Sequence, residues 1–145
     1  MTQTNKAAWK KQLCRWSLFY YWLPLIVWMG LVFWFSSQPQ PIDLPESWLE
    51  TLVGKGGHVL GYAGLGLLWW RALAARWGKC DRRTVTLAFF LTVLYAISDE
   101  YHQTFVPGRS GNPVDVLIDA AAAGLVLWPV RLWQKRQPVD AAGST

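Results

Sequence analysis

The sequence predicts an all-α integral membrane protein, a bundle of four transmembrane helices with both termini on the cytoplasmic side. Hydrophobic residues make up 52% of the 145 residues and charged residues only 16%, whereas a soluble domain averages about 25% charged residues. The chain also has four apolar segments of roughly twenty residues, the length that crosses a bilayer as a helix. Its basic residues gather on one side of these segments. This length leaves room for one domain.

The first apolar segment covers residues 16–35, WSLFYYWLPLIVWMGLVFWF, and contains no charged side chain. At about 1.5 Å per residue, it spans a hydrocarbon core of roughly 30 Å. A cleaved signal peptide is the alternative, but the run is too long and too aromatic, and no A-x-A-like site follows it. We therefore expect an uncleaved transmembrane helix. Because this helix is apolar all round, it is expected to form a lipid-facing wall.

Three further apolar segments cover residues 51–70, residues 84–97 with a polar extension to Gln103, and residues 114–133. They are continuous rather than alternating, which disfavours the strands of a membrane barrel. The chain thus divides into a basic cytoplasmic N-terminal segment (1–15), a transmembrane domain (16–133) and a polar cytoplasmic tail (134–145).

Small residues occur in two of these segments. Gly57 and Gly61 lie four residues apart in the second segment, and Gly64 and Gly66 follow. The fourth segment contains the alanines of residues 120–123 and then Gly124. Small side chains let transmembrane helices approach closely. The second and fourth helices are therefore expected to be neighbours.

The distribution of charge predicts the orientation. Twelve of the 14 Lys and Arg residues fall on one side of the four segments. The positive-inside rule makes that side cytoplasmic, as in a multi-pass protein of the cytoplasmic (inner) membrane. The net charge of +5 is therefore a topology signal, and no nucleic-acid partner is expected. The twelve are Lys6, Lys10, Lys11, Arg15, Arg71, Arg76, Lys79, Arg82, Arg83, Arg131, Lys135 and Arg136.

Polar side chains recur on single faces of the last three segments, at the end opposite the basic residues. Helical spacing places each of three sets on one face. Charged groups inside a bilayer usually face the bundle interior and pair with one another. We therefore predict a shared, outward-facing polar pocket. The sets are Lys55, His58 and Tyr62; Asp99 and Gln103, with Glu100 beside them; and Asp115 and Asp119.

Arg109 lies in the short link PGRSGN between the third and fourth segments. The link contains Pro107, Gly108 and Gly111, so a tight turn is expected. Such a turn places the guanidinium over the mouth of the pocket, where it is suited to bidentate binding of a carboxylate or phosphate.

The spacing Lys55-x2-His58-x3-Tyr62, then Asp99-Glu100-x2-Gln103-x-Phe105-x3-Arg109, then Asp115-x3-Asp119 resembles the VanZ-like family over about residues 50–128. The resemblance implies a small multi-helix membrane protein. The founding member of that family is linked to resistance to the glycopeptide antibiotic teicoplanin.

The function predicted for the pocket is the binding of an anionic lipid or a lipid-linked envelope precursor. Lys55 and Arg109 would hold the anionic headgroup, and other ligand contacts are expected from Tyr62, Gln103 and Asp115. The acid–base candidates, should the ligand be modified, are His58, Asp99, Glu100 and Asp119. A carboxylate such as that of Asp99 would fix the tautomer of His58. No nucleophile motif such as G-x-S-x-G is present, so binding is favoured over catalysis.

Two alternatives stay open at this stage. His58 with neighbouring carboxylates has the donor types of a divalent-metal site. Otherwise Lys55 and Arg109 would form a closed salt-bridge network with the acids that only fixes the helix register. Two cations facing four acids leave an excess of negative charge, which favours a ligand site over a pure clasp. The sequence leaves cofactor and oligomeric state open.

Overall fold

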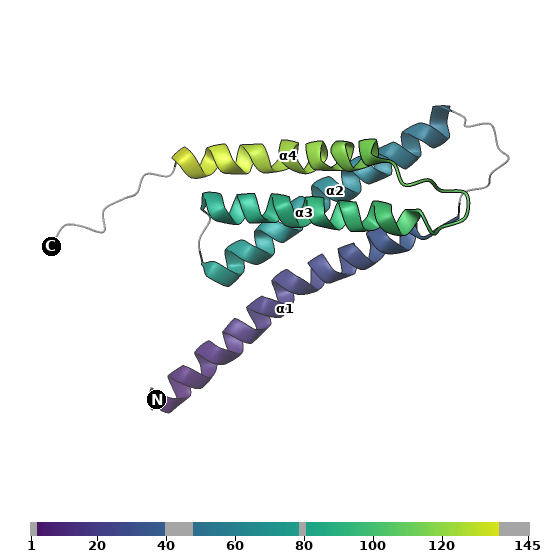
Figure 1. Cartoon of the computed structure of the whole chain (residues 1–145). Coiled ribbons are helices and arrows are strands. Elements are labelled where there is room, and N and C mark those ends of the chain that lie inside the picture. Colours follow the sequence, from purple (N-terminus) through teal and green to yellow (C-terminus); the bar gives the residue numbers. More distant parts are fainter. Residues whose placement is uncertain (1–2, 40–47, 79–80, 137–145) are drawn as a thin grey trace.

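The computed structural model describes the backbone of residues 3–39, 48–78 and 81–136, and the side chains of residues 19–39, 56–78 and 81–132. Over these ranges the chain forms four α-helices and no strand (Figure 1). The all-α prediction is therefore confirmed. The helices are α1 (Gln3–Ser36), α2 (Trp48–Trp77), α3 (Arg82–Gln103) and α4 (Pro113–Arg136).

The helices extend past the boundaries drawn from hydropathy alone. α1 already begins at Gln3, and α4 continues to Arg136. The residues involved include Lys, Gln, Arg and Ala, which are good helix formers, so loss of apolar character does not end a helix. The basic flanks are thus helical continuations of α1 and α4 as far as the structure describes them.

α2 lies at the centre of the packing. It contacts α1, α3 and α4, and packs most extensively against α4, whereas α1 reaches α3 only slightly. Gly66 of α2 packs closely against α4, because a Cβ there would lie 3.4 Å from Ala123 Cβ. The predicted α2–α4 neighbourhood is confirmed.

Gly61 and Gly64 serve a different contact, against α1. The Trp28 Nε1–H donates to the Gly61 carbonyl over 2.9 Å, and a Cβ on Gly64 would lie 3.0 Å from the Trp28 ring. The glycines of α2 therefore allow close contact with two helices rather than one: Gly61 and Gly64 contact α1, and Gly66 contacts α4.

Local sequence explains where the helices end. α2 stops before Gly78, whose φ of +61° is the left-handed conformation that favours glycine after a helix. Asp81 caps α3, since its Oδ1 accepts from the Thr84 N–H at 2.9 Å. Asn112 caps α4 by accepting from the Val114 N–H at 3.0 Å, and Pro113 occupies the first helical position, where its missing N–H is harmless.

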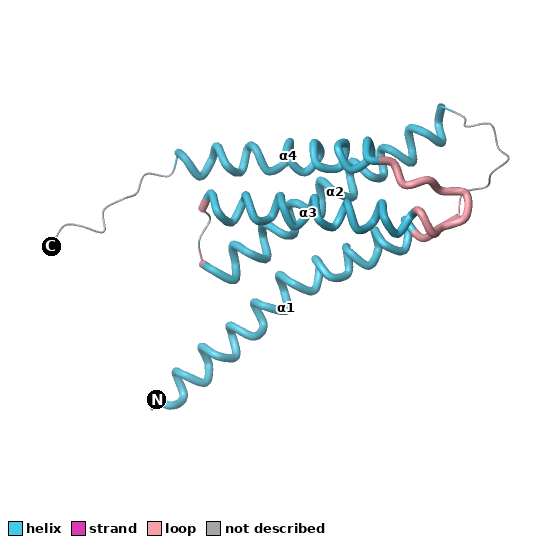
Figure 2. The backbone as a smooth tube through the Cα atoms, viewed as in Figure 1, coloured by secondary structure: helices cyan, strands magenta, loops and turns pink. Residues whose placement is uncertain are grey.

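The link between α3 and α4 lies beside the C-terminal end of α1 (Figure 2). It turns at Gly108, which has a φ of +78°. α1 begins and α4 ends at the opposite end of the bundle (Figure 1). One end of the molecule therefore combines the end of α1, the end of α3 and the start of α4.

Many large apolar side chains lie on the outside. Phe19, Leu60, Phe90 and Leu125 are each more than 60% exposed. Two of the helices, over Phe19–Ser36 and Pro113–Leu132, are long and apolar enough to cross a membrane. An apolar exterior around buried polar groups suits a protein surrounded by lipid.

Candidate functional site

A buried hydrogen-bonded chain joins α2 and α3. The Tyr62 hydroxyl donates to Asp99 Oδ2 over 2.9 Å, and Gln103 Nε2 donates to the same oxygen over 3.2 Å. All three side chains are at most 5% exposed. The sequence predicted the shared face of Asp99 and Gln103 from their i, i+4 spacing, and this contact confirms it.

α1 takes part in the same chain of hydrogen bonds. Gln103 Nε2 also donates to Ser36 Oγ over 2.8 Å, and Ser36 is buried. The end of α1 therefore contributes to this chain, one residue past the apolar segment that was expected to form a lipid-facing wall. The available signal was the polar sequence Ser36-Ser37-Gln38 directly after the apolar segment.

His58 contacts a carboxylate of α4. Its Nδ1 lies 3.4 Å from Asp119 Oδ2, so an ionised Asp119 would accept from an Nδ1–H. The imidazole also stacks on Tyr62, with ring centroids 6.1 Å apart and planes at 19°. The carboxylate in contact with His58 is thus that of Asp119, while Asp99, the example given from the sequence, accepts from Tyr62. His58 and Tyr62 share a face, as the spacing predicts.

Glu100 fixes the start of α4. Its Oε2 accepts from the Asn112 N–H over 2.8 Å, and the side chain is buried. A Cβ on neighbouring Gly111 would lie only 2.7 Å from the Glu100 carbonyl oxygen, so the link passes very close to α3. One carboxylate oxygen of Glu100 therefore positions the link.

Arg109 connects the link to α1. Its Nε donates to the Gln38 carbonyl over 3.0 Å and its Nη2 to the Phe35 carbonyl over 3.4 Å. Nη1 donates to Gln103 Oε1 over 3.3 Å. A basic side chain at these carbonyls satisfies acceptors that the end of α1 leaves open. Within the described residues Arg109 makes no salt bridge with a carboxylate, so its part of the suggested closed salt-bridge network is not formed.

Three buried carboxylate oxygens have no hydrogen-bond partner among the described residues. They are Asp99 Oδ1, Glu100 Oε1 and Asp119 Oδ1. Their side chains are 3%, 6% and 1% exposed. A buried polar atom left unsatisfied costs about 1–3 kcal/mol, and more when it is charged. We name Asp99, Glu100 and Asp119, together with His58, the acidic cluster.

The members of the acidic cluster come from α2, α3 and α4 and lie near one another. The charges of Asp119, Asp99 and Glu100 all act on the His58 imidazole. No group of three or more His, Cys, Asp or Glu side chains in the described part of the chain is close enough to hold a metal ion. The geometry there thus gives the metal alternative no support.

Asp115 lies beside the acidic cluster, because its charge acts on the carboxyl groups of Glu100 and Asp119. Asp115 is half-buried and lies in the first turn of α4, where a negative charge stabilises the helix. The side chain of Lys55 lies outside the described side chains.

The predicted pocket mouth is not among the clefts seen. Two clefts are found at the opposite end, one lined by Arg76 with residues of α1 and one by Arg82 and Arg83 with residues of α3. Within the described side chains, the three carboxylates of the acidic cluster are buried and have unused acceptors, whereas His58 is partly exposed.

Comparison with known proteins agrees with the motif spacing. The family model described as VanZ/LLP1 matches residues 21–134, most of the chain, including every residue of the acidic cluster. No curated protein and no solved structure matches the chain. The chain belongs to the VanZ/LLP1 family.

Proposed function

We propose that this chain is a multi-pass protein of the cytoplasmic (inner) membrane, with both termini inside. Its acidic cluster binds the headgroup of an envelope lipid or a lipid-linked envelope precursor. All four helices cross the bilayer in this proposal. Family membership, the apolar exterior and the one-sided basic residues support the membrane setting.

The observation that carries the proposal is the set of three open oxygens on Asp99, Glu100 and Asp119. A purely structural clasp satisfies its own members, because unsatisfied buried acceptors oppose folding. Three unsatisfied carboxylate oxygens on neighbouring side chains fit a binding site in which a ligand supplies the hydrogen-bond donors. Since carboxylates accept hydrogen bonds, the ligand presents donors, namely hydroxyl or ammonium groups.

The anionic part of the ligand is assigned to Arg109. A guanidinium has five N–H donors, and the described hydrogen bonds of Arg109 use three of them. Two donors are thus left for a phosphate. Because Gln103 bonds both Asp99 and Arg109, the donor-binding and phosphate-binding ends of the proposed site are directly connected. Lys55, one helical turn before His58, is the second candidate for the phosphate.

An acid–base step is a second candidate function, favoured by the contact between His58 and Asp119. His58 Nδ1 lies 3.4 Å from Asp119 Oδ2. In this second proposal Nδ1 carries the proton and donates to Asp119, which makes Nε2 the basic nitrogen. The imidazole is 25% exposed. In this role Nε2 accepts a proton from a ligand hydroxyl, and His58→Gln would keep the ligand bound but unmodified.

Native mass spectrometry of the protein purified in mild detergent tests the binding proposal. The wild type is expected to retain a lipid-sized mass that is lost in Asp99→Asn. Asp81→Asn is the matched control and is expected to retain the mass. It removes the same charge from an exposed residue at the opposite end of the bundle, and asparagine also caps a helix. A wild type that carries no ligand after mild extraction, or equal loss in both variants, would contradict the proposal.

A further inference from the structure

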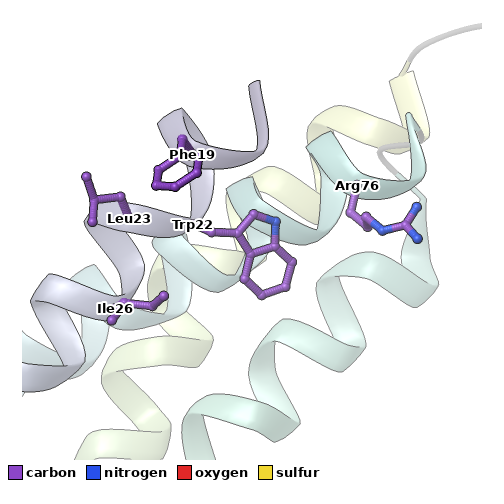
Figure 3. A pocket seen from close by; sticks show the side chains of 5 residues that line it. All are labelled: Phe19, Trp22, Leu23, Ile26 and Arg76. Atoms are coloured by element: carbon purple, nitrogen blue, oxygen red, sulfur yellow. The ribbon is translucent and has the colours of Figure 1, made fainter. Parts of the chain in front are cut away.

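A cleft of about 370 Å³ lies between α1 and the C-terminal end of α2. It is lined by four residues of α1, Phe19, Trp22, Leu23 and Ile26, and by Arg76 of α2. Figure 3 shows the Trp22 indole extending from α1 toward the side where Arg76 lies. The cleft is apolar along α1 and has one cation at its α2 edge.

The cleft is at the boundary of the apolar zone. Phe19 lies near the start of the apolar segment of residues 16–35, and Arg76 is in the last turn of α2. The distance from Phe19 to Ile26 along α1 is about 10 Å, at 1.5 Å per residue. An amphiphile with its charged group at Arg76 would therefore place its hydrocarbon along α1, inside the apolar zone.

Two polar groups lining the cleft lack partners in the described part of the chain. Arg76 makes no hydrogen bond or salt bridge there. The Trp22 Nε1–H is buried and has no acceptor. The neighbouring Arg71 differs, because its Nη2 donates to the Tyr20 carbonyl over 3.3 Å and its guanidinium lies 4.7 Å from the Tyr20 ring centre.

We propose that this cleft binds one anionic phospholipid of the leaflet facing the Arg76 end. The phosphate accepts from the Arg76 guanidinium, and the acyl chain lies against Phe19, Leu23 and Ile26. Charge complementarity with Arg76 selects an anionic over a zwitterionic lipid, while the apolar lining selects a hydrocarbon chain over a soluble phosphate. This site is independent of the acidic cluster, which lies at the opposite end of the bundle.

Delipidated protein titrated with short-chain phosphatidylglycerol or phosphatidylcholine, and analysed by native mass spectrometry, tests this proposal. We expect the wild type to bind the first phosphatidylglycerol about fivefold more tightly than phosphatidylcholine, the effect of one basic group on an anionic lipid. Arg76→Gln should abolish this preference. Arg131→Gln, which removes the same charge from α4 without touching the cleft, should keep it.

A second variant tests the apolar part. Leu23→Trp, at a position 51% exposed, fills the cleft and is expected to weaken binding of both lipids by several-fold while the protein unfolds at its normal temperature. Inorganic phosphate should not compete at millimolar concentration. The proposal is overturned if Arg76→Gln keeps the preference, if Arg131→Gln loses it equally, if phosphate displaces the lipid, or if Leu23→Trp binds both lipids normally.

The two ligand proposals can fail separately. Asp99→Asn removes the proposed headgroup site and should leave phosphatidylglycerol binding at the cleft unchanged. Arg76→Gln should leave the co-purifying ligand of the acidic cluster in place. Loss of cleft binding in Asp99→Asn would contradict the independence of the two sites.

Discussion

The Tyr62 hydroxyl is a buried donor whose acceptor is Asp99. Tyr62→Phe removes the donor and leaves Oδ2 of Asp99 with Gln103 alone, so we expect a loss of about 1–3 kcal/mol in the free energy of unfolding. Unfolding in mixed detergent micelles measures this loss. Tyr101→Phe removes the same hydroxyl from a side chain that is 67% exposed and should change stability by less than about 0.5 kcal/mol. Equal effects of the two substitutions would contradict the account of Tyr62.

The sequence predicted which side chains share one face of a helix, but not all of their hydrogen-bond partners on other helices. Spacing along one helix correctly placed His58 beside Tyr62, because helical periodicity fixes angular position. The pairing of His58 with Asp119 rather than Asp99 depends on how α2 lies against α3 and α4. Counting residues gives depth along a helix and not lateral position, so this choice was not available from the sequence.

At the scale of elements, the α3–α4 link passes against α3 at Gly111. A Cβ there would lie 2.7 Å from both the Glu100 carbonyl oxygen and Thr104 Cγ2. Gly111→Ala must therefore shift the link, and we expect a loss of about 1–3 kcal/mol in the free energy of unfolding. Gly30→Ala in α1, where nothing lies within 4 Å, should be neutral or stabilising. A neutral Gly111→Ala would contradict the tight contact of the link.

Arg109 connects that link to the end of α1 through a planar group that reaches two carbonyls and Gln103. A lysine ammonium cannot reproduce this geometry. Arg109→Lys is therefore expected to speed amide hydrogen exchange in residues 104–112 by roughly tenfold, through easier local opening. Arg131→Lys serves as the control and should not affect the link. Unchanged exchange in Arg109→Lys would show that a positive charge alone is enough to hold the link against α1.

Hydropathy predicted the four helices, and the small residues of α2 and α4 predicted the contact between these two helices. The hydrogen bonds made by the end of α1 could not be predicted from the sequence. Its contribution consists of the Ser36 hydroxyl and the carbonyls of Phe35 and Gln38. Backbone carbonyls carry no residue-specific signal, and a serine at the end of an apolar run is ordinary.

At the scale of the whole molecule, the proposed topology places the α3–α4 link outside and the basic end inside. In intact cells, a membrane-impermeant maleimide should label Ser110→Cys, which lies in the exposed part of the link. The native Cys14 and Cys80 are internal controls. Both lie among the basic residues of the sequence that the positive-inside rule assigns to the cytoplasm, and they should react only after permeabilisation. The reverse labelling pattern would overturn the orientation.

The burial of the three carboxylates of the acidic cluster is a property of the whole molecule. The sequence predicted a polar site at this end but an open pocket, with Arg109 facing a carboxylate or a ligand. Instead, the helices pack closely enough to bury the carboxylates. The Arg109 guanidinium donates hydrogen bonds to backbone carbonyls at the end of α1. Packing of this kind depends on all four helices together, which no single segment reveals.

The free energy of unfolding of delipidated Asp119→Asn tests the central claim, that the acidic cluster is a ligand site and not a clasp. The amide keeps an oxygen for His58 and removes a buried charge with an open oxygen. We predict stability equal to or above that of the wild type, as expected where a site is kept for function at the expense of stability. A loss of about 3–5 kcal/mol, the usual effect of breaking a buried ion pair, would contradict the claim and make the acidic cluster a structural clasp.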